Sequence, residues 1–268
     1  MLGDPSVLTA RDAGVLTVTI NRPDRGNALD GEAVARLIDI LSEISAEPGE
    51  IRAVVLRSEG KHFCTGAEIG GGGSGSGSAR PHIGHMVRSL AAGPHRLVQL
   101  LWDCPLPVVA ELTGRSSGLG LHLALACDIT VAAHGATFAE PFGERGFSVD
   151  SGGSWLLPRF VGLARAQRLL YTGEVIDAAT ALEWGLVSEV VPDAQLPARV
   201  VEVASSLASR ATFAISTMKR LLHQGLDRTL GDSLLREAEA IELTIRSDDF
   251  KEGMRAFAER RPPNFSGH

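Results

Sequence analysis

Apolar residues along the chain recur with two different periods, which predict strands and helices in alternation. Short β-branched stretches that alternate or run almost continuously are typical of strands. They lie at Val15–Ile20, Ile51–Ser58, Pro107–Leu112, Asp128–Ala133 and Val187–Val191. The segment Gly31–Glu47 has apolar residues at helical spacing instead, and Asp30 before it is a typical N-cap residue. Because helices alternate with strands, the pattern predicts an α/β fold with parallel crossovers.

The pattern changes after Pro192, beyond which no strand is predicted. The later segments with helical periodicity are Val200–Ser209, Thr212–Gln224, Leu230–Ile245 and Asp249–Arg260. A helix interrupted at Gly93 is also expected over Arg80–Asp103. We therefore expect a sheet-containing core over residues 1–192 and a helical C-terminal segment over residues 193–268.

One stretch of low complexity, Gly70–Ser78, consists only of glycine and serine. Such a stretch is either a flexible linker between domains or a mobile loop over a site. The flanking segments look like parts of one sheet core, which favours the loop. We expect it to be mobile without a ligand and partly ordered with one.

Composition narrows the class of protein. The 268 residues are 44% hydrophobic and 22% charged, as in a soluble globular enzyme, and the formal net charge is −6. This charge disfavours binding to nucleic acid or to an anionic membrane, and no apolar run approaches the ~18 residues of a membrane span. The N-terminus lacks a secretory signal pattern. Three isolated cysteines match neither a disulfide framework nor a zinc site, so a reducing, cytoplasmic location without a metal is expected.

Two stretches of the sequence have features of a site that binds a negatively charged oxygen. "FCTGAEI" (Phe63–Ile69) follows a buried strand, at the end of a sheet where ligands bind in α/β folds. "SSGLGLHLALACDI" begins an entirely apolar helix whose first N–H groups are free to bind an anion. Together these turns predict a two-donor oxyanion hole. The helix carries one polar residue, His122, in an otherwise apolar run from Gly118 to Cys127.

The order of motifs resembles the crotonase family, also called the enoyl-CoA hydratase/isomerase superfamily. The matching stretches include "INRPDRGNALD", "IRAVVLRSEGKHFCTGAEI", "PLPVVAELTGRSSGLGLHLALACDITVAA", "TGEVIDAATALEWGLVSEVVP" and "KEGMRAFAERRPPNF". The resemblance implies a spiral of ββα turns that holds the CoA and acyl site, with a helical C-terminal trimerisation segment. It also implies a homotrimer or a dimer of trimers. The substrate would be an acyl-CoA thioester that reacts through an enolate, and no separate cofactor is expected because CoA is part of the substrate.

Matched residue by residue, the oxyanion donors are the backbone N–H groups of Ala67 and Leu119. Most members have glycine at the second position, so Leu119 is a departure. His122 falls at the first catalytic glutamate of the hydratases and Phe142 at the second. Both hydratase carboxylates are therefore missing, which disfavours simple hydration of a straight-chain enoyl-CoA.

A replacement acid follows in "FSVDSGGSWLLPRFVG". This stretch is similar to "PDSGGSWLLPR" in ring-1,2-epoxyphenylacetyl-CoA isomerases, whose catalytic aspartate matches Asp150; Val149 stands where those proteins usually have proline. From the residues alone, Asp150 is predicted to be a helix N-cap, and the catalytic role is what the resemblance adds. His122 is equally a core histidine satisfied by a backbone carbonyl. Glu140 and Glu144, on either side of Phe142, are within reach of the pocket and are expected to be a surface or ion-pair charge and a residue at the edge of the site.

The resemblance also implies a grip on CoA that is made mainly by backbone groups. The positions concerned are Arg25, Gly26, Ala28, Ala67, Glu68, Ile69 and Gly70. Arg25 would pair with a phosphate. The C-terminal stretch "AFAERRPPNF" would close over the nucleotide, from the same or a neighbouring subunit, with Arg260 and Arg261 as further phosphate contacts. Cys64 is expected to serve packing and Asp128 to stabilise a turn.

The leading interpretation is an acyl-CoA isomerase in which Asp150 moves a proton and His122 positions the acyl group or acts as a second acid/base. The alternatives are a hydratase or hydrolase in which His122 activates water, and a non-catalytic protein that binds acyl-CoA. RNA binding, known for a few family relatives, is disfavoured by the acidic balance.

Overall fold

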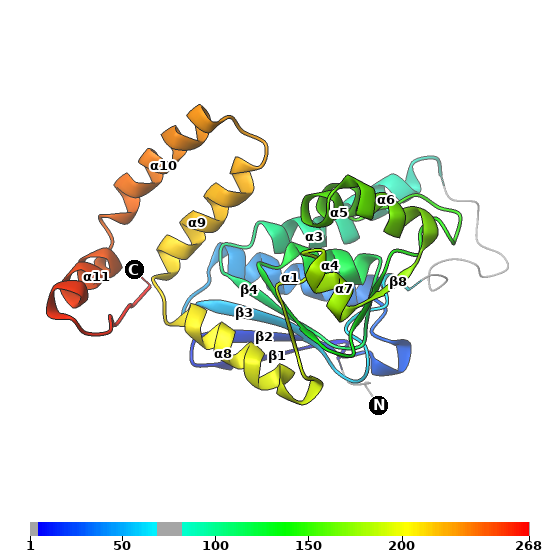
Figure 1. The fold of residues 1–268 in the computed structure, drawn as a ribbon, viewed down its shortest axis with the longest axis horizontal. Helices are drawn as coiled ribbons and strands as arrows, with labels where there is room; N and C mark the ends of the chain where they lie inside the picture. Colours follow the sequence, from blue (N-terminus) through cyan, green and yellow to red (C-terminus); the bar gives the residue numbers. More distant parts are fainter. Residues whose placement is uncertain (1–4, 69–81, 268) are drawn as a thin grey trace.

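A six-stranded sheet forms the centre of the molecule (Figure 1). The structure is a computed structural model and describes residues 5–68 and 82–267. The strand order is β1-β2-β3-β4-β6-β9, and every pair is parallel except the β1–β2 pair. The strands are β1 (Val7–Asp12), β2 (Val15–Ile20), β3 (Ala53–Ser58), β4 (Val108–Leu112), β6 (Ile129–Ala133) and β9 (Glu189–Val191).

Helices cover both faces of this sheet, and its central strands β3 and β4 are accordingly apolar at most positions. Alternate residues of a strand point to opposite faces. Leu56 of β3 therefore joins the main core beneath α1 (Gly31–Ala46), α3 (Pro94–Trp102) and α4 (Leu119–Ala126). Its neighbour Val55 joins a smaller cluster with Val200 of α8 (Leu196–Ala208), which lies on the other face (Figure 1).

A second, three-stranded sheet lies beside the first and orders the residues around α4. Its strands are β5 (Arg115–Ser117), β7 (Thr137–Ala139) and β8 (Val175–Asp177), with β7 in the middle. The remaining helices are α2 (His85–Ala92), α5 (Gly153–Val161), α6 (Leu163–Thr172), α7 (Ala178–Glu183), α9 (Thr212–Gly225), α10 (Leu230–Thr244) and α11 (Asp248–Glu259). Because β5 leads directly into α4, this sheet fixes where that helix begins.

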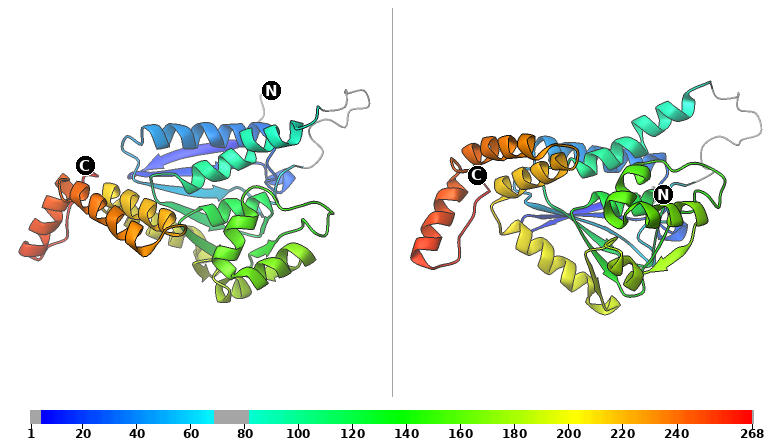
Figure 2. Two further views of the ribbon diagram at one scale, coloured as in Figure 1. Left: turned by 90° about the horizontal axis from the view of Figure 1, so that it is seen from above. Right: turned by 45° about the horizontal axis from the view of Figure 1, so that its top comes forward.

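The helices α10 and α11 project away from the sheet, as both views of Figure 2 show. A buried ion pair holds α9 to the core: Lys219 Nζ lies 2.8 Å from Asp128 Oδ2. The same carboxylate oxygen accepts a hydrogen bond of 2.7 Å from the backbone N–H of Val108 at the start of β4. Asp128 thus stabilises a turn, as expected, and also anchors the C-terminal helices.

The predicted strands and helices are confirmed, with ends shifted by a few residues. Asp30 is the N-cap of α1, since its side chain accepts a hydrogen bond from the N–H of Ala33. The interrupted helix is α2 followed by α3, divided at Gly93. The pattern missed β1 because only Val7 is buried in that edge strand, and it missed β5, β7 and β8 because each has three residues.

Within residues 5–68 and 82–267, no helix is long and apolar enough to cross a membrane. The cysteines Cys64, Cys104 and Cys127 are all buried and free.

We expect Lys219→Met to destabilise the protein by about 3 kcal/mol, because it leaves Asp128 partly buried without its cation. Thermal or urea unfolding measures the change. The control is Arg165→Met, which removes an exposed ion pair with Glu183 and is expected to cost less than about 1 kcal/mol. Equal effects of the two substitutions would contradict the anchoring role of Lys219.

Candidate active site

Backbone hydrogen bonds join the loop after β3 to strand β5. The N–H of Phe63 donates to Thr113 O at 2.8 Å, and the N–H of Cys64 donates to Arg115 O at 3.2 Å. In return the N–H of Ser117 donates to Cys64 O at 3.0 Å. The two stretches that the sequence analysis singled out are therefore bonded to each other, side by side.

This pairing leaves two backbone donors without acceptors within the described ranges. Gly66 O accepts from Leu29 and Glu68 N–H donates to Leu29 O, which leaves the N–H of Ala67 between them unpaired. The N–H of Leu119 is the first of α4 and has no acceptor within the helix. Both are free to bind an oxygen atom of a ligand.

The close approach of the two stretches requires glycine at position 120. A Cβ atom there would lie 2.1 Å from Cys64 O, a distance that no side chain tolerates. Leu119 fits without conflict because its side chain is buried in the main core. The leucine that replaces the usual glycine thus contributes to packing and leaves its N–H unpaired.

His122 is completely buried one turn further along α4, against Glu140, which follows β7 and is also fully buried. The Nε2 atom of His122 and the Oε1 atom of Glu140 are 3.1 Å apart. The angle between the two groups is unsuitable for a hydrogen bond. Neither side chain has a hydrogen-bond partner in the part of the chain that the structure describes. The interpretation of His122 as a core histidine satisfied by a backbone carbonyl is therefore wrong. The expected surface position of Glu140 is wrong, and its contact with His122 is an ion pair only when the imidazole is protonated.

Burial raises the pKa of Glu140 above its ordinary value, opposed by the imidazole of His122 and reinforced by the carboxylate of Asp150. Asp150 lies three residues before Gly153, which packs on His122, and the backbone carbonyl of Asp150 accepts a hydrogen bond of 3.0 Å from the N–H of Gly153. The structure therefore brings His122, Glu140 and Asp150 together.

Asp150 is not a helix cap, contrary to the alternative interpretation. The N-cap of α5 is Gly152, with no side-chain cap hydrogen bond. Ser151 and Gly152 both have positive φ angles, 47° and 85°, a conformation that is uncommon for serine. This turn separates the half-buried Asp150 from α5 and lets Gly153 pack directly on His122: a Cβ at 153 would lie 2.3 Å from Nε2.

Phe142 covers the beginning of α4. Its side chain is buried, and its ring is parallel to that of His122 with centroids 5.8 Å apart. A Cβ at Gly118 would lie 3.7 Å from the tip of this ring. Phe142 thus occupies the second carboxylate position as an apolar wall, whereas Glu144 is exposed.

Cys64 is buried beside the two donors, and burial raises the pKa of its thiol to about 12. A thiol that stays protonated at neutral pH is a poor nucleophile. Cys64 contributes packing, as expected.

A cleft of about 460 Å³ adjoins the Ala67 donor and contains many of the residues expected to bind CoA. Its walls include Arg25, Ala28, Ala67 and Glu68, together with Thr65, Ser117, Arg115 and Arg145. Gly26 lies behind the wall, where a Cβ would be 3.2 Å from the Thr65 side chain. Ile69, Gly70 and the expected mobile loop at 70–78 lie outside the described residues.

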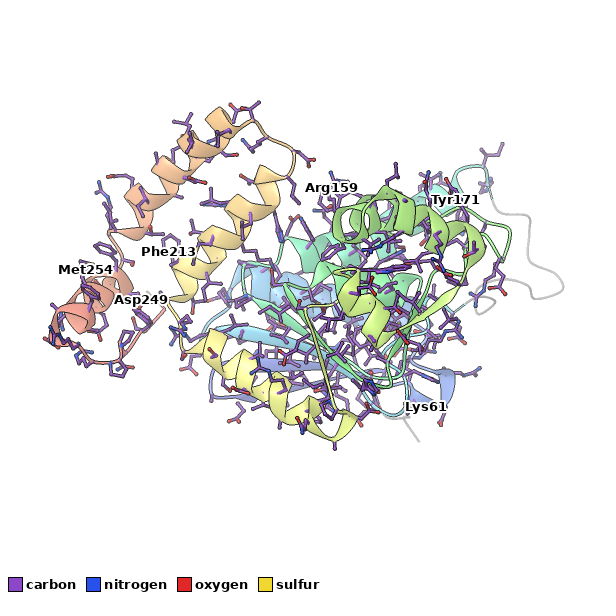
Figure 3. All side chains as sticks on the ribbon, in the orientation of Figure 1. Lys61, Arg159, Tyr171, Phe213, Asp249 and Met254 are labelled. Atoms are coloured by element: carbon purple, nitrogen blue, oxygen red, sulfur yellow. The ribbon has the colours of Figure 1, made fainter. Side chains whose placement is uncertain are left out.

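Arg115 and Arg145 were missed by the sequence analysis. They lie on a short strand and in a loop, and only the tertiary fold brings them to Arg25. Conversely, the C-terminal basic pair does not reach the cleft of its own chain, and a contact with the cleft of a neighbouring subunit stays a prediction. Arg261 is bound to Glu252 at 2.6 Å, and Figure 3 places α11, marked by Met254, at the opposite end of the molecule from Lys61.

Comparison with known proteins gives a consistent result. The family model for enoyl-CoA hydratase/isomerase matches residues 10–268. The chain is 34% identical to the 1,2-epoxyphenylacetyl-CoA isomerase of Escherichia coli K12, over 97% of this chain and 98% of the relative. It is 35% identical to a probable enoyl-CoA hydratase of Rhodobacter capsulatus, over 95% of each chain. The crystal structure of an enoyl-CoA hydratase from Bacillus anthracis superposes with a TM-score of 0.89 at 30% identity, covering 98% of this chain and 100% of that one.

We expect Gly120→Ala to separate the two donor segments and to destabilise the protein by about 1–3 kcal/mol, because the new methyl group meets backbone rather than a flexible side chain. The matched control is Gly31→Ala in α1, where a Cβ meets nothing within 4 Å. Unfolding curves of both variants, with turnover of an acyl-CoA, test this. An unchanged midpoint and unchanged turnover in Gly120→Ala would contradict it.

Proposed function

We propose that this chain, which belongs to the enoyl-CoA hydratase/isomerase family (the crotonase superfamily), is an acyl-CoA enzyme that shifts a proton or a double bond within its substrate. The observation that carries the proposal is the pair of unpaired N–H groups at Ala67 and Leu119, on segments bonded to each other. A half-buried carboxylate, Asp150, lies near the same helix.

In this proposal the thioester carbonyl oxygen binds the two backbone donors. Removing a proton from the acyl group then gives an enolate, whose negative charge develops on that oxygen. Donors that are already in place cost no reorganisation when the charge forms, and each contributes roughly 2.7–4 kcal/mol in measured cases. The dipole of α4 adds to this stabilisation because its positive end faces the oxygen.

Asp150 is the group that takes the proton and returns it at another carbon. Two observations support this role. Its side chain does not cap α5, so the carboxylate is available. Phe142 places an apolar ring at the second carboxylate position of the hydratases. Position 142 therefore supplies no carboxylate that could move the proton in place of Asp150. His122 positions the acyl group or acts as the second acid/base.

A second candidate is hydration or hydrolysis with His122 activating water. The carboxylate of Glu140 behind the imidazole favours it, since an acid that orients a histidine is the usual way to make a general base. The phenylalanine at position 142 weighs against it, because hydration needs two groups to position and deprotonate one water and the second carboxylate is missing. The third candidate is a non-catalytic protein that binds acyl-CoA. The carboxylate of Asp150, which does not cap α5 and is free to move a proton, weighs against it.

The arginines of the cleft are proposed to bind the phosphates of CoA. Glu68, the acid among the cleft residues, is paired with Arg22 at 2.7 Å. The guanidinium groups of Arg115 and Arg145 have no carboxylate partner in the part of the chain that the structure describes. Their positive charge is therefore available to an anionic ligand.

The assembly is proposed to be a homotrimer or a dimer of trimers. The C-terminal helices expose large apolar side chains, among them Leu222, Leu230 and Phe257, which a neighbouring subunit would cover. The three free, buried cysteines suit the reducing cytoplasm, where we place the protein.

We expect the protein to bind CoA, and Arg145→Ala and Arg115→Ala each to raise the Kd by about tenfold through the loss of a charge-assisted contact with phosphate. Isothermal titration calorimetry measures this. Arg11→Ala, an exposed position on β1 away from the cleft, is the control. Failure to bind CoA or any CoA thioester at millimolar concentration would remove the basis of the proposal.

We expect Asp150→Asn to reduce kcat by about 10²–10⁴-fold, because the amide cannot accept and return a proton. CoA binding is expected to persist. His122→Gln should cause a smaller loss and a changed preference among acyl groups. Turnover of a panel of acyl-CoA thioesters, followed by mass spectrometry, separates isomerisation at constant mass from the gain of one water.

The control is Asp39→Asn on the exposed face of α1. Full activity of Asp150→Asn together with complete loss in His122→Gln, including any pH inflection in the histidine range, would reject the isomerase and support the water-activating role of His122.

A further inference from the structure

The contact between His122 and Glu140 is a buried pair of titratable groups at the core of the proposed site. Both side chains are 0% exposed, and the Nε2–Oε1 distance is 3.1 Å. Neither nitrogen of the imidazole and neither oxygen of the carboxyl group has a hydrogen-bond partner in the described part of the chain. Such groups are rarely left unpaired without a functional reason.

The charge of the pair follows from its surroundings. An ionised Glu140 beside a neutral imidazole would leave an uncompensated buried negative charge, which is strongly unfavourable. The charged groups that act on Glu140 are His122 on α4 and Asp150 before α5. Burial of both side chains disfavours a charge on either group, and Asp150 adds a second negative charge beside Glu140. The surroundings therefore favour a pair in which Glu140 holds the extra proton and neither group is charged.

The position of the proton on His122 follows from the geometry. Glu140 faces Nε2, and the same edge of the ring packs on Gly153, where a Cβ would lie 2.3 Å from Nε2 and 2.5 Å from Cε1. A protonated Glu140 can donate only to a Nε2 lone pair, so the ring proton lies on Nδ1. The short, poorly aligned contact is of the kind that tightens when a ligand binds.

We propose that Glu140 is a positioning residue that keeps His122 neutral with its proton on Nδ1, so that His122 serves the reaction as a hydrogen-bond donor. The inference rests on the proposed function, in which His122 acts on the acyl group. It deepens that function by excluding His122 as the base. A Nδ1–H group that lacks an acceptor in the described chain is left to bind an acceptor atom of the ligand.

The first test is the tautomer itself, which does not depend on turnover. Protein labelled with ¹⁵N-histidine is examined by NMR, and the signals of His122 are identified by their absence in His122→Gln. We expect Nδ1 to be protonated and Nε2 to be a lone-pair nitrogen at neutral pH. Protonation at Nε2 alone, or at both nitrogens, would overturn the proposal even if the proposed reaction is correct.

The second test uses two substitutions of Glu140. Glu140→Gln keeps a donor toward Nε2 in its amide group, so it should retain activity within a few-fold of wild type. Glu140→Leu removes the donor at similar volume and is expected to lower kcat by about 10–100-fold, the usual range for a residue that orients a functional side chain. The Kd for CoA should not change in either variant.

The third test combines Glu140→Leu with His122→Gln. If Glu140 acts through His122, the double variant has the kcat of His122→Gln alone. Three results would overturn the proposal: equal losses in Glu140→Gln and Glu140→Leu, no change of kcat in Glu140→Leu, or additive losses in the double variant. Failure of the isomerase assignment would show instead as full activity of Asp150→Asn, with the histidine tautomer unaffected.

Discussion

The close backbone contact between Cys64 and Gly120 is the constraint on which the site depends. It holds the loop after β3 against the beginning of α4, with Cys64 bonded on both sides to β5. Because the contact is between backbone atoms, it fixes the two N–H donors without reliance on any side chain other than the absent one of Gly120. The carbonyl-binding part of the site is therefore a property of the fold, and it tolerates leucine at position 119.

Two buried pairs of titratable groups have different roles in the core. Lys219 and Asp128 are close, hydrogen-bonded and satisfied by additional backbone groups of Leu106 and Val108. Such a pair stabilises a particular arrangement, here the junction of α9 with the sheet. The pair His122–Glu140 has a longer contact of 3.1 Å and no hydrogen-bond partner within the described chain. That difference separates a structural pair from one that is available to a ligand.

Much of the fold could be predicted from the periodicity of apolar residues, because the strands β2, β3, β4 and β6 are buried on both faces and α1 has a regular apolar stripe. The exposed edge strand β1 and the three-residue strands carry too little pattern to be found. The site was less predictable, because the spacing of residues along the chain does not show which loops meet in the folded protein. Asp150 looked like a cap until the turn at Ser151 was seen, and Glu140 looked like a surface charge until the fold placed it on His122. The oxyanion donors and their roles came from resemblance to a family, not from periodicity.

Backbone groups bind the substrate oxygen and side chains move the proton in this proposal, which explains how one fold supports several reactions. In the proposed function, the donors at Ala67 and Leu119 stabilise negative charge on the thioester oxygen whatever the acyl group does next. The outcome then depends on which proton-carrying groups face the acyl carbons, and in this chain these are positions 122, 142 and 150. A phenylalanine at 142 stands in place of one hydratase carboxylate, and a histidine in contact with Glu140 stands in place of the other. With both exchanged, Asp150 is left as the group able to move a proton, which favours a reaction that returns the proton it takes over one that adds water.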